Sequence, residues 1–302
     1  MTSILTNNAA SAALQTLRNV NRELEMTQNR ISTGLKVSSA SDNASYWSIA
    51  TTMRSDSAMM STVSDALGLG AAVTDTAYQG MNSAIDLVSQ IKTKLLAARN
   101  PGVDKDKVNT EISALKAQLL SGVKASSFNG QNWLYNTAGT PGTKEIVGSF
   151  SRDAAGDLTI GFVSVDTAST VLVDTNTAGN GILTKGVGAA GYTLSGAASD
   201  VKVASTTTET EITAMINAVD DMLNSMTNAA SVLGATSTTI SKQAEFVKTL
   251  KASIDRGIGS LVDADMNEES SKLKALQTQQ QLGIQALTIA NSDSSNILAL
   301  FR

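Results

Sequence analysis

The chain has 302 residues, a length typical of one or two domains with a sizeable hydrophobic core. Its formal net charge is −4, so it has no basic excess to neutralise phosphates, and we expect no nucleic-acid partner. Cysteine and histidine are both absent, which excludes disulfides, Cys-ligated zinc and every His-dependent catalytic triad. Carboxylate or lysine chemistry stays open, but we expect neither an enzyme nor catalytic, cofactor-binding or metal-binding residues.

Targeting signals of the common kinds are missing from the sequence. The first eight residues, MTSILTNN, do not combine a basic region with an apolar core, so they do not predict a Sec-type signal peptide. No apolar stretch approaches the roughly 20 residues that a membrane-spanning helix needs. We expect no membrane insertion, and a secreted form of the chain must leave the cell by another route.

The N-terminal third carries apolar residues at the alternating 3–4 spacing of a helical seam. Positions 10, 13, 17, 20, 24, 27 and 31 are apolar in six of seven cases. A second run from Met60 to Leu95 is apolar at nine of eleven such positions. A third helix is predicted over roughly 105–121, with Asp104 as N-cap and Gly122 just past its end.

The middle of the chain has a different composition. Eleven of the 22 glycines fall within residues 136–208, among many Thr, Ser and Ala residues. Short runs such as 158–165 (LTIGFVSV) alternate apolar and polar residues, and AAGD at 154–157 is a turn signal. We therefore predict a β-hairpin over 144–166, and a small surface insertion over 167–207.

The C-terminal third returns to long helical seams. From Ile212 to Leu261, thirteen of fifteen seam positions are apolar, and Ser237 and Lys251 are the exceptions. The stretch from Leu273 onwards is apolar on more than one face, so a monomer would leave part of it uncovered. The predicted fold is mainly α: a long antiparallel coiled coil or bundle of both chain ends, with a β-hairpin and a small β-rich central insertion. The uncovered faces favour self-assembly.

Four motifs near the two ends resemble those of bacterial flagellins. Residues 30–44 (RISTGLKVSSASDNA) resemble the R-L-S-S-G-L-R-I-N-S-A-x-D-D-A signature, and 126–130 (SSFNG) with Leu134 resemble T-x-F-N-G-x-x-L-L. Residues 261–269 (LVDADMNEE) resemble I-x-D-A-D-x-A-x-E. The tail, QALTIAN at 285–291 and ILALF at 297–301, resembles Q-A-x-x-x-L-A-Q-A-N followed by V-L-x-L-L. Two departures are Asn43, where the pattern has a second Asp, and Ser45-Tyr46-Trp47, where it has small residues.

The resemblance implies a structural subunit that polymerises into the flagellar filament for swimming motility. It implies export in the unfolded state by the flagellar type III apparatus with an export chaperone, and ends that become ordered on assembly. The implied partners are further copies of the chain, other flagellins, and the filament cap and hook-junction proteins. The implied location is extracellular.

Domain boundaries follow from the same resemblance. Residues 1–44 and 262–302 would form a terminal coiled coil lining an inner tube. Residues 45–166 and 208–261 would form a helical bundle with its hairpin as an outer tube, and 167–207 the insertion.

Eight apolar residues are the candidates for polymerisation and terminal helix packing. We expect those of the N-terminal arm to contact those of the C-terminal arm. The eight are Leu17, Leu24, Ile31, Leu273, Leu276, Leu287, Ile297 and Phe301.

The acidic motif has one alternative interpretation, and the whole chain has two. Asp263, Asp265, Glu268 and Glu269 could suggest a cation site, but the EF-hand loop and its glycine are missing, so a solvated helix start or a polar subunit contact is favoured. A hook–filament junction protein shares the terminal helices, but the complete motif set favours the filament. A secreted hydrolase, or a flagellin with an enzymatic insertion, is disfavoured by the short central segment.

Overall fold

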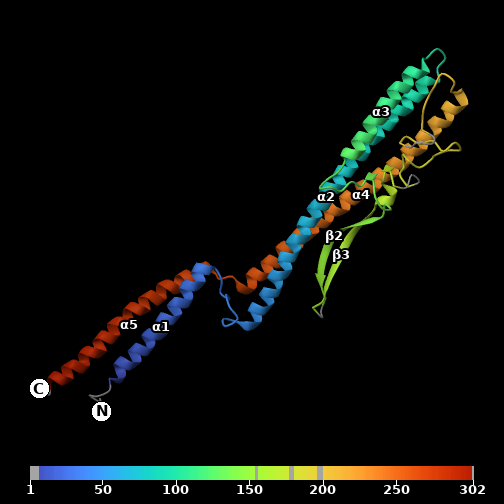
Figure 1. Ribbon diagram of the computed structural model, residues 1–302. Helices are drawn as coiled ribbons and strands as arrows, with labels where there is room; N and C mark the ends of the chain where they lie inside the picture. The colour runs from blue at the N-terminus through green and yellow to red at the C-terminus, as the bar shows by residue number, and fades with distance from the viewer. Residues whose placement is uncertain (1–6, 154–155, 177–179, 196–199, 301–302) are drawn as a thin grey trace. The chain divides into compact units, whose positions relative to one another are not determined.

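A computed structural model describes residues 7–153, 156–176, 180–195 and 200–300, and within these ranges the fold is mainly helical, as predicted. Two compact units are formed: residues 1–58 with 252–302, and residues 59–251. Figure 1 shows the chain coloured from its N-terminus to its C-terminus. Among the described residues, no helix has both the length and the hydrophobicity to cross a membrane.

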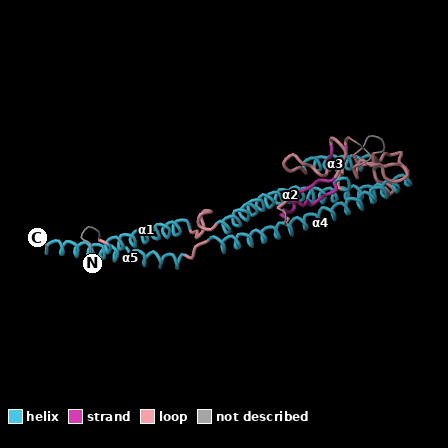
Figure 2. Tube along the Cα trace, turned by 90° about the horizontal axis from the view of Figure 1, so that it is seen from below, coloured by secondary structure: helices cyan, strands magenta, loops and turns pink. Residues whose placement is uncertain are grey.

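The first unit contains an antiparallel pair of terminal helices, α1 (Asn8–Thr33) and α5 (Met266–Leu300). The two helices lie side by side in both Figure 1 and Figure 2. Helix α1 begins where the Asn7 side chain accepts a hydrogen bond from the Ala10 N–H. It ends at Gly34, whose φ of 73° is a left-handed conformation that glycine adopts without strain.

The second unit is built on long stretches of α2 (Ala44–Ala98) and α4 (Glu209–Val262). All eleven predicted seam positions between Met60 and Leu95 are buried, including the two non-apolar ones, Gly70 and Thr74. The Thr74 hydroxyl is satisfied because it donates to the Gly70 carbonyl at 2.8 Å. None of the fifteen predicted positions between Ile212 and Leu261 is exposed. The heptad prediction is confirmed for both helices.

Helix α3 (Lys105–Ala125) packs beside α2, with Ile112 and Leu119 fully buried. Asp104 is its N-cap, as predicted, because its carboxylate accepts from the N–H groups of Asp106 and Lys107. The predicted end at Gly122 is wrong by about one turn. Gly122 lies inside the helix, and the chain leaves the helix only at Ser126.

The predicted hairpin is confirmed as strands β2 (Thr143–Arg152) and β3 (Leu158–Asp166), which pair antiparallel. Figure 2 shows both strands in magenta. A register irregularity between Val147 and Ser149 marks a bulge. Ile146 of β2 is buried against Gly70 of α2. A Cβ on Gly70 would lie 2.6 Å from the Ile146 Cγ2, so the close approach requires glycine at this position.

The described residues of the insertion contain one short 3-10 turn, Thr167–Ser169, and strand β4 (Val173–Asp174), which pairs parallel with β1 (Tyr135–Asn136). Its apolar side chains are covered. The buried ones are Val171, Leu172, Val173, Leu183, Leu194, Val201 and Val203. The segment is therefore packed against its surroundings over much of its length.

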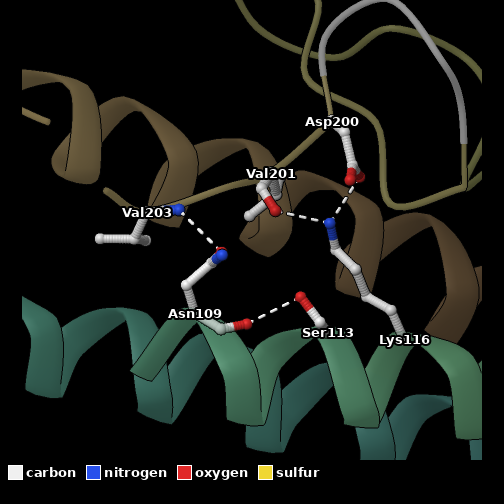
Figure 3. A network of polar contacts seen from close by, with 6 residues as sticks. All are labelled: Asn109, Ser113, Lys116, Asp200, Val201 and Val203. Carbon is white, nitrogen blue, oxygen red and sulfur yellow. Dashed lines mark hydrogen bonds and ion pairs between the residues drawn. The ribbon is translucent and has the colours of Figure 1, made fainter. Parts of the chain in front are cut away.

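Polar contacts hold the end of the insertion on α3 (Figure 3). Lys116 forms an ion pair with Asp200 and also donates to the Val201 carbonyl. Asn109, about two α-helical turns earlier, accepts from the Val203 N–H at 3.1 Å. Burial lowers the pKa of Lys116, although the ion pair with Asp200 opposes this shift.

Candidate assembly interface

One face of α1 is covered, and it is the face predicted from the heptad spacing. The seven predicted positions from Ala10 to Ile31 are all half-buried or buried. The one polar member, Thr27, is only 1% exposed. Nearly every other side chain of the helix is exposed, with Arg30 the main exception. Helix α1 therefore uses a narrow coiled-coil seam, not a broad apolar face.

Helix α5 presents a matching seam with the same 4–3 spacing. Its covered positions are Glu269, Leu273, Leu276, Gln280, Gly283, Leu287 and Ala290. Only three of the seven are large apolar residues. The packing stabilisation available from this seam is correspondingly small, because it grows with the apolar area removed from water.

Among the described residues, three hydrogen bonds that involve a side chain link α1 or its N-cap to α5. The Asn7 amide donates to the Ala290 carbonyl, and the Gln280 amide donates to the Asn21 side chain, both at 2.8 Å. Near the other end, Arg30 Nη1 lies 3.1 Å from Glu269 Oε1. None of these three contacts is predictable from the sequence alone.

A small residue on α5 accommodates a large one on α1. A Cβ placed on Gly283 would lie 3.2 Å from the Leu17 Cδ1 atom and 4.0 Å from the Leu17 Cβ. The Leu17 side chain thus fills the space that the missing Gly283 side chain leaves, as a knob fits a hole.

Two of the family-like motifs meet directly beyond the ends of these helices. Backbone N–H groups of Lys36 and Val37 donate to the Val262 carbonyl, and the Ala264 N–H donates to the Gly34 carbonyl at 2.9 Å. A small cluster of buried Val37, Ala50 and Val262 lies beside this bridge.

Trp47, one of the departures noted above, packs partly buried against that cluster. In this chain the aromatic ring therefore serves local packing.

The second departure, Asn43, does not disturb the local structure. Its side-chain oxygen accepts from the Tyr46 N–H at 3.1 Å, so it caps the start of α2. The preceding Asp42 accepts hydrogen bonds from the backbone and side chains of Ser38 and Ser39, which lower its pKa. The turn between α1 and α2 is closed by these polar contacts.

The structure describes the side chains of six of the eight residues predicted to pack between the terminal helices. Leu17, Leu24, Ile31, Leu273 and Leu287 are half-buried, and Leu276 is 4% exposed. All six lie on the covered faces of α1 and α5. Ile297 belongs to α5, but its side chain is outside the description, and Phe301 lies outside the described residues.

Other large apolar side chains of the two helices stay uncovered. Leu282, Ile284 and Ile289 of α5 are exposed by 58%, 51% and 62%, and Met26 of α1 by 52%. Leu282 and Ile289 are seven residues apart and share one side of α5, whereas Ile284 lies on another. The helix pair thus offers apolar surface on two further sides.

The acidic motif holds no metal-binding arrangement. Within the described part of the chain, no group of three His, Cys, Asp or Glu residues is placed to hold a metal ion. Glu269 instead lies in the seam, where its Oε2 atom is buried with no hydrogen-bond partner.

Both ends of the chain match known regions of one protein family. The bacterial flagellin N-terminal helical region matches residues 4–138, and the bacterial flagellin C-terminal helical region matches residues 216–301. Flagellin C of Rhizobium meliloti strain 1021 is 52% identical over 321 residues, and the match covers 100% of each chain.

Two other relatives extend the comparison. A flagellin of Brucella melitensis biotype 1 is 45% identical over 303 residues, again with 100% of each chain covered. Flagellin A of R. meliloti strain 1021 is 45% identical over 395 residues at the same coverage, so it contains segments that this shorter chain lacks. Both terminal regions and full-length relatives agree, and the chain belongs to the bacterial flagellin family.

Proposed function

We propose that this flagellar filament subunit polymerises through the α1–α5 pair, with the exposed apolar sides of that pair covered by neighbouring copies. Membership of the flagellin family makes the chain a structural subunit of the bacterial flagellar filament, located outside the cell. The observation that carries the proposal is the exposure of Leu282, Ile284 and Ile289 beside a seam that is itself covered.

The energetic reason lies in how little a two-helix pair can bury. An isolated antiparallel pair covers one side of each helix, and helices of this kind depend on tertiary packing for their stability. Large apolar side chains on the remaining sides favour contacts with further helices. In a polymer of identical chains, those helices are the α1–α5 pairs of adjacent subunits.

The same reasoning supports different structural roles for different segments of the chain. We propose that residues 1–44 and 262–302 form the inner coiled coil of the filament, and that 45–166 with 208–261 form an outer bundle. Residues 167–207 form the insertion on that bundle. The buried heptads of α2 and α4 support a bundle that folds before assembly, whereas the thin seam of α1 and α5 supports ordering during assembly.

Further partners follow from the family and belong to the proposal. They are the flagellar type III export apparatus with a chaperone for export in the unfolded state, and the filament cap and hook-junction proteins. Other flagellins are possible co-subunits. We infer no catalytic activity and no cofactor, since the flagellin family is structural. The relatives described above are all flagellins, and none of them favours the hook–filament junction alternative.

Seeded elongation tests the proposal. Purified chain is added to short filament seeds and examined by negative-stain electron microscopy. Growth to micrometre-long filaments is expected. Failure to elongate, together with capping of hook ends, would instead support a junction protein.

A matched pair of variants tests the role of the seam. Leu276→Asp places a charge at a position that is 4% exposed, whereas Leu276→Met keeps its volume and hydrophobicity. We expect Leu276→Asp to stop elongation and Leu276→Met to permit it, while both monomers keep the wild-type melting temperature. Elongation by the Asp variant at the wild-type rate would contradict the proposed role of α5.

A further inference from the structure

The apolar residues of the α1–α5 seam do not by themselves select one alignment of the two helices. On α1 the large seam residues Leu17, Leu24 and Ile31 recur every seven positions. A shift of one heptad in either direction, about 10 Å along the helix, therefore returns a large apolar residue to two of these three places. Small residues such as Ala10 and Ala13 fit either alignment. The Gln280 amide loses Asn21 in a shifted alignment, but this hydrogen bond is exposed, so water can replace it.

The connection to the rest of the chain leaves room for such a shift. Ten residues separate the end of α1 at Thr33 from the start of α2 at Ala44. Extended, they span about 33 Å. The backbone hydrogen bonds between residues 34–37 and 262–264 carry no side-chain specificity, so a shifted chain can form equivalent bonds elsewhere.

The ion pair of Arg30 and Glu269, in contrast, is specific to one alignment, because a one-heptad shift moves Arg30 about 10 Å away from Glu269. The Glu269 side chain is 10% exposed, its Oε1 lies 3.1 Å from Arg30, and its Oε2 is buried without a hydrogen-bond partner. A buried carboxylate that loses its single cationic partner is strongly destabilising.

Neither shifted alignment places a basic residue at the seam position of Arg30. One heptad before Arg30 stands Glu23, a like charge, and one heptad after it stands Val37, which lies beyond the end of α1. Each shift therefore removes the seam partner of the carboxylate, and one of them adds repulsion.

We propose that Arg30 and Glu269 act as a register lock, which selects the one alignment of α1 on α5 when the ends pair. The two residues are positioning residues for assembly: they lie in two different family-like motifs, 239 residues apart, and their pairing sets which seam residues face each other. This inference rests on the proposed pairing of the ends in the filament.

Disulfide reporters read the alignment directly, since the chain has no cysteine of its own. Leu17→Cys with Gly283→Cys reports the observed alignment, because the two Cβ positions are 4.0 Å apart, within the ~3.5–4.5 Å of a disulfide. Ala10→Cys and Leu24→Cys, each combined with Gly283→Cys, report the two one-heptad shifts. Double-cysteine subunits are diluted into an excess of cysteine-free subunits, so that any disulfide is intramolecular, and peptide mass spectrometry identifies it after oxidation of the filaments.

Moving the arginine by one heptad gives the sharpest test. In a Glu23→Arg, Arg30→Glu variant, Glu269 finds its partner only in the shifted alignment, with net charge unchanged. We expect the ratio of the 10–283 to the 17–283 disulfide to rise by about tenfold or more over otherwise wild-type filaments. Glu269→Leu removes the lock, so both shifted disulfides should increase. Glu268→Leu, the same change at the exposed neighbouring position, should leave the 17–283 disulfide dominant.

The possible outcomes distinguish a failure of the register lock from a failure of the α1–α5 pairing itself. If the 17–283 disulfide remains equally dominant in the arginine-moved and Glu269→Leu filaments, the lock is wrong although the helices pair. If none of the three disulfides forms in otherwise wild-type filaments, the pairing of the ends is itself wrong, and the lock with it.

Discussion

Gly80 of α2 and Gly122 of α3 are both helical, but their surroundings are opposite. A Cβ on Gly80 would lie 2.7 Å from the Ser126 Cβ and 2.8 Å from the Leu134 Cδ1. No atom lies within 4 Å of the same position on Gly122. One glycine therefore permits close packing, whereas the other only adds backbone freedom to the unfolded chain.

Alanine at the two positions should change stability in opposite directions. Gly80→Ala should lower the free energy of unfolding of the monomer by about 1–3 kcal/mol through overpacking. Gly122→Ala should raise it by about 0.5–1 kcal/mol. Urea denaturation followed by circular dichroism measures both. Equal effects at the two sites would show that the contacts around Gly80 do not limit its size.

Lys116 gives the second unit a pH-dependent contribution to stability. Its pKa is lowered from the ordinary value of 10.5 by burial, with Lys202 adding repulsion and Asp200 opposing the shift. Between the lowered pKa and 10.5, the unfolded chain holds more protons at this residue than the folded one. The stability contribution of Lys116 therefore rises with pH in that window and is constant well below it.

A variant isolates this contribution. The difference in free energy of unfolding between the wild type and Lys116→Met should shift in favour of the wild type as the pH rises towards 10.5. Urea midpoints at a series of alkaline pH values measure the difference. A difference that stays constant, or that falls, contradicts a lowered pKa in the folded state.

At the level of elements, periodicity predicted most of what the helices do. The sequence predicts the heptad positions of α1, α2 and α4, and these positions are covered even where the residue is Thr27, Gly70 or Thr74. This works because a helix of known phase buries a fixed set of positions whatever residue stands there. The end of α3 was predicted too early, because Gly122 stops a helix only when the left-handed conformation is adopted, and here it is not.

The contacts between distant segments were beyond prediction from one sequence. Arg30 and Glu269 each stand in a recognisable motif, yet nothing local to either indicates the other as a partner. The same holds for Lys116 with Asp200, and for Leu17 with Gly283. Such pairs depend on how helices are aligned, and a repeat of seven residues leaves that alignment degenerate.

Truncation of a side chain in α1 and truncation of one in α4 should have different effects: the first should weaken the filament, and the second should destabilise the monomer. Leu24→Ala removes a half-buried side chain from α1, and it should weaken each subunit's packing by up to about 2–5 kcal/mol. Filaments should depolymerise at a lower temperature while the monomer melts as the wild type does. Leu233→Ala, at a fully buried position of α4, should instead lower the melting temperature of the monomer. A lowered monomer melting temperature for Leu24→Ala with unchanged filaments would reverse these roles.

At the level of the whole molecule, the chain combines two kinds of helical packing. Residues 59–251 form a compact unit with a continuous buried core, which includes Leu67, Met81, Ile91, Met222 and Leu233. The terminal helices share a seam with only a few large apolar residues and leave others exposed. We propose that this contrast is the physical basis for a subunit whose middle folds alone and whose ends gain their order from neighbours.

Amide hydrogen exchange on the monomer and on the filament tests that account most directly. The account predicts that amides of α2 and α4 within residues 59–251 exchange slowly in both states. Amides of α1 and α5 should exchange rapidly in the monomer and slowly in the filament. Equal protection of α1 and α5 in the monomer and in the filament would contradict it.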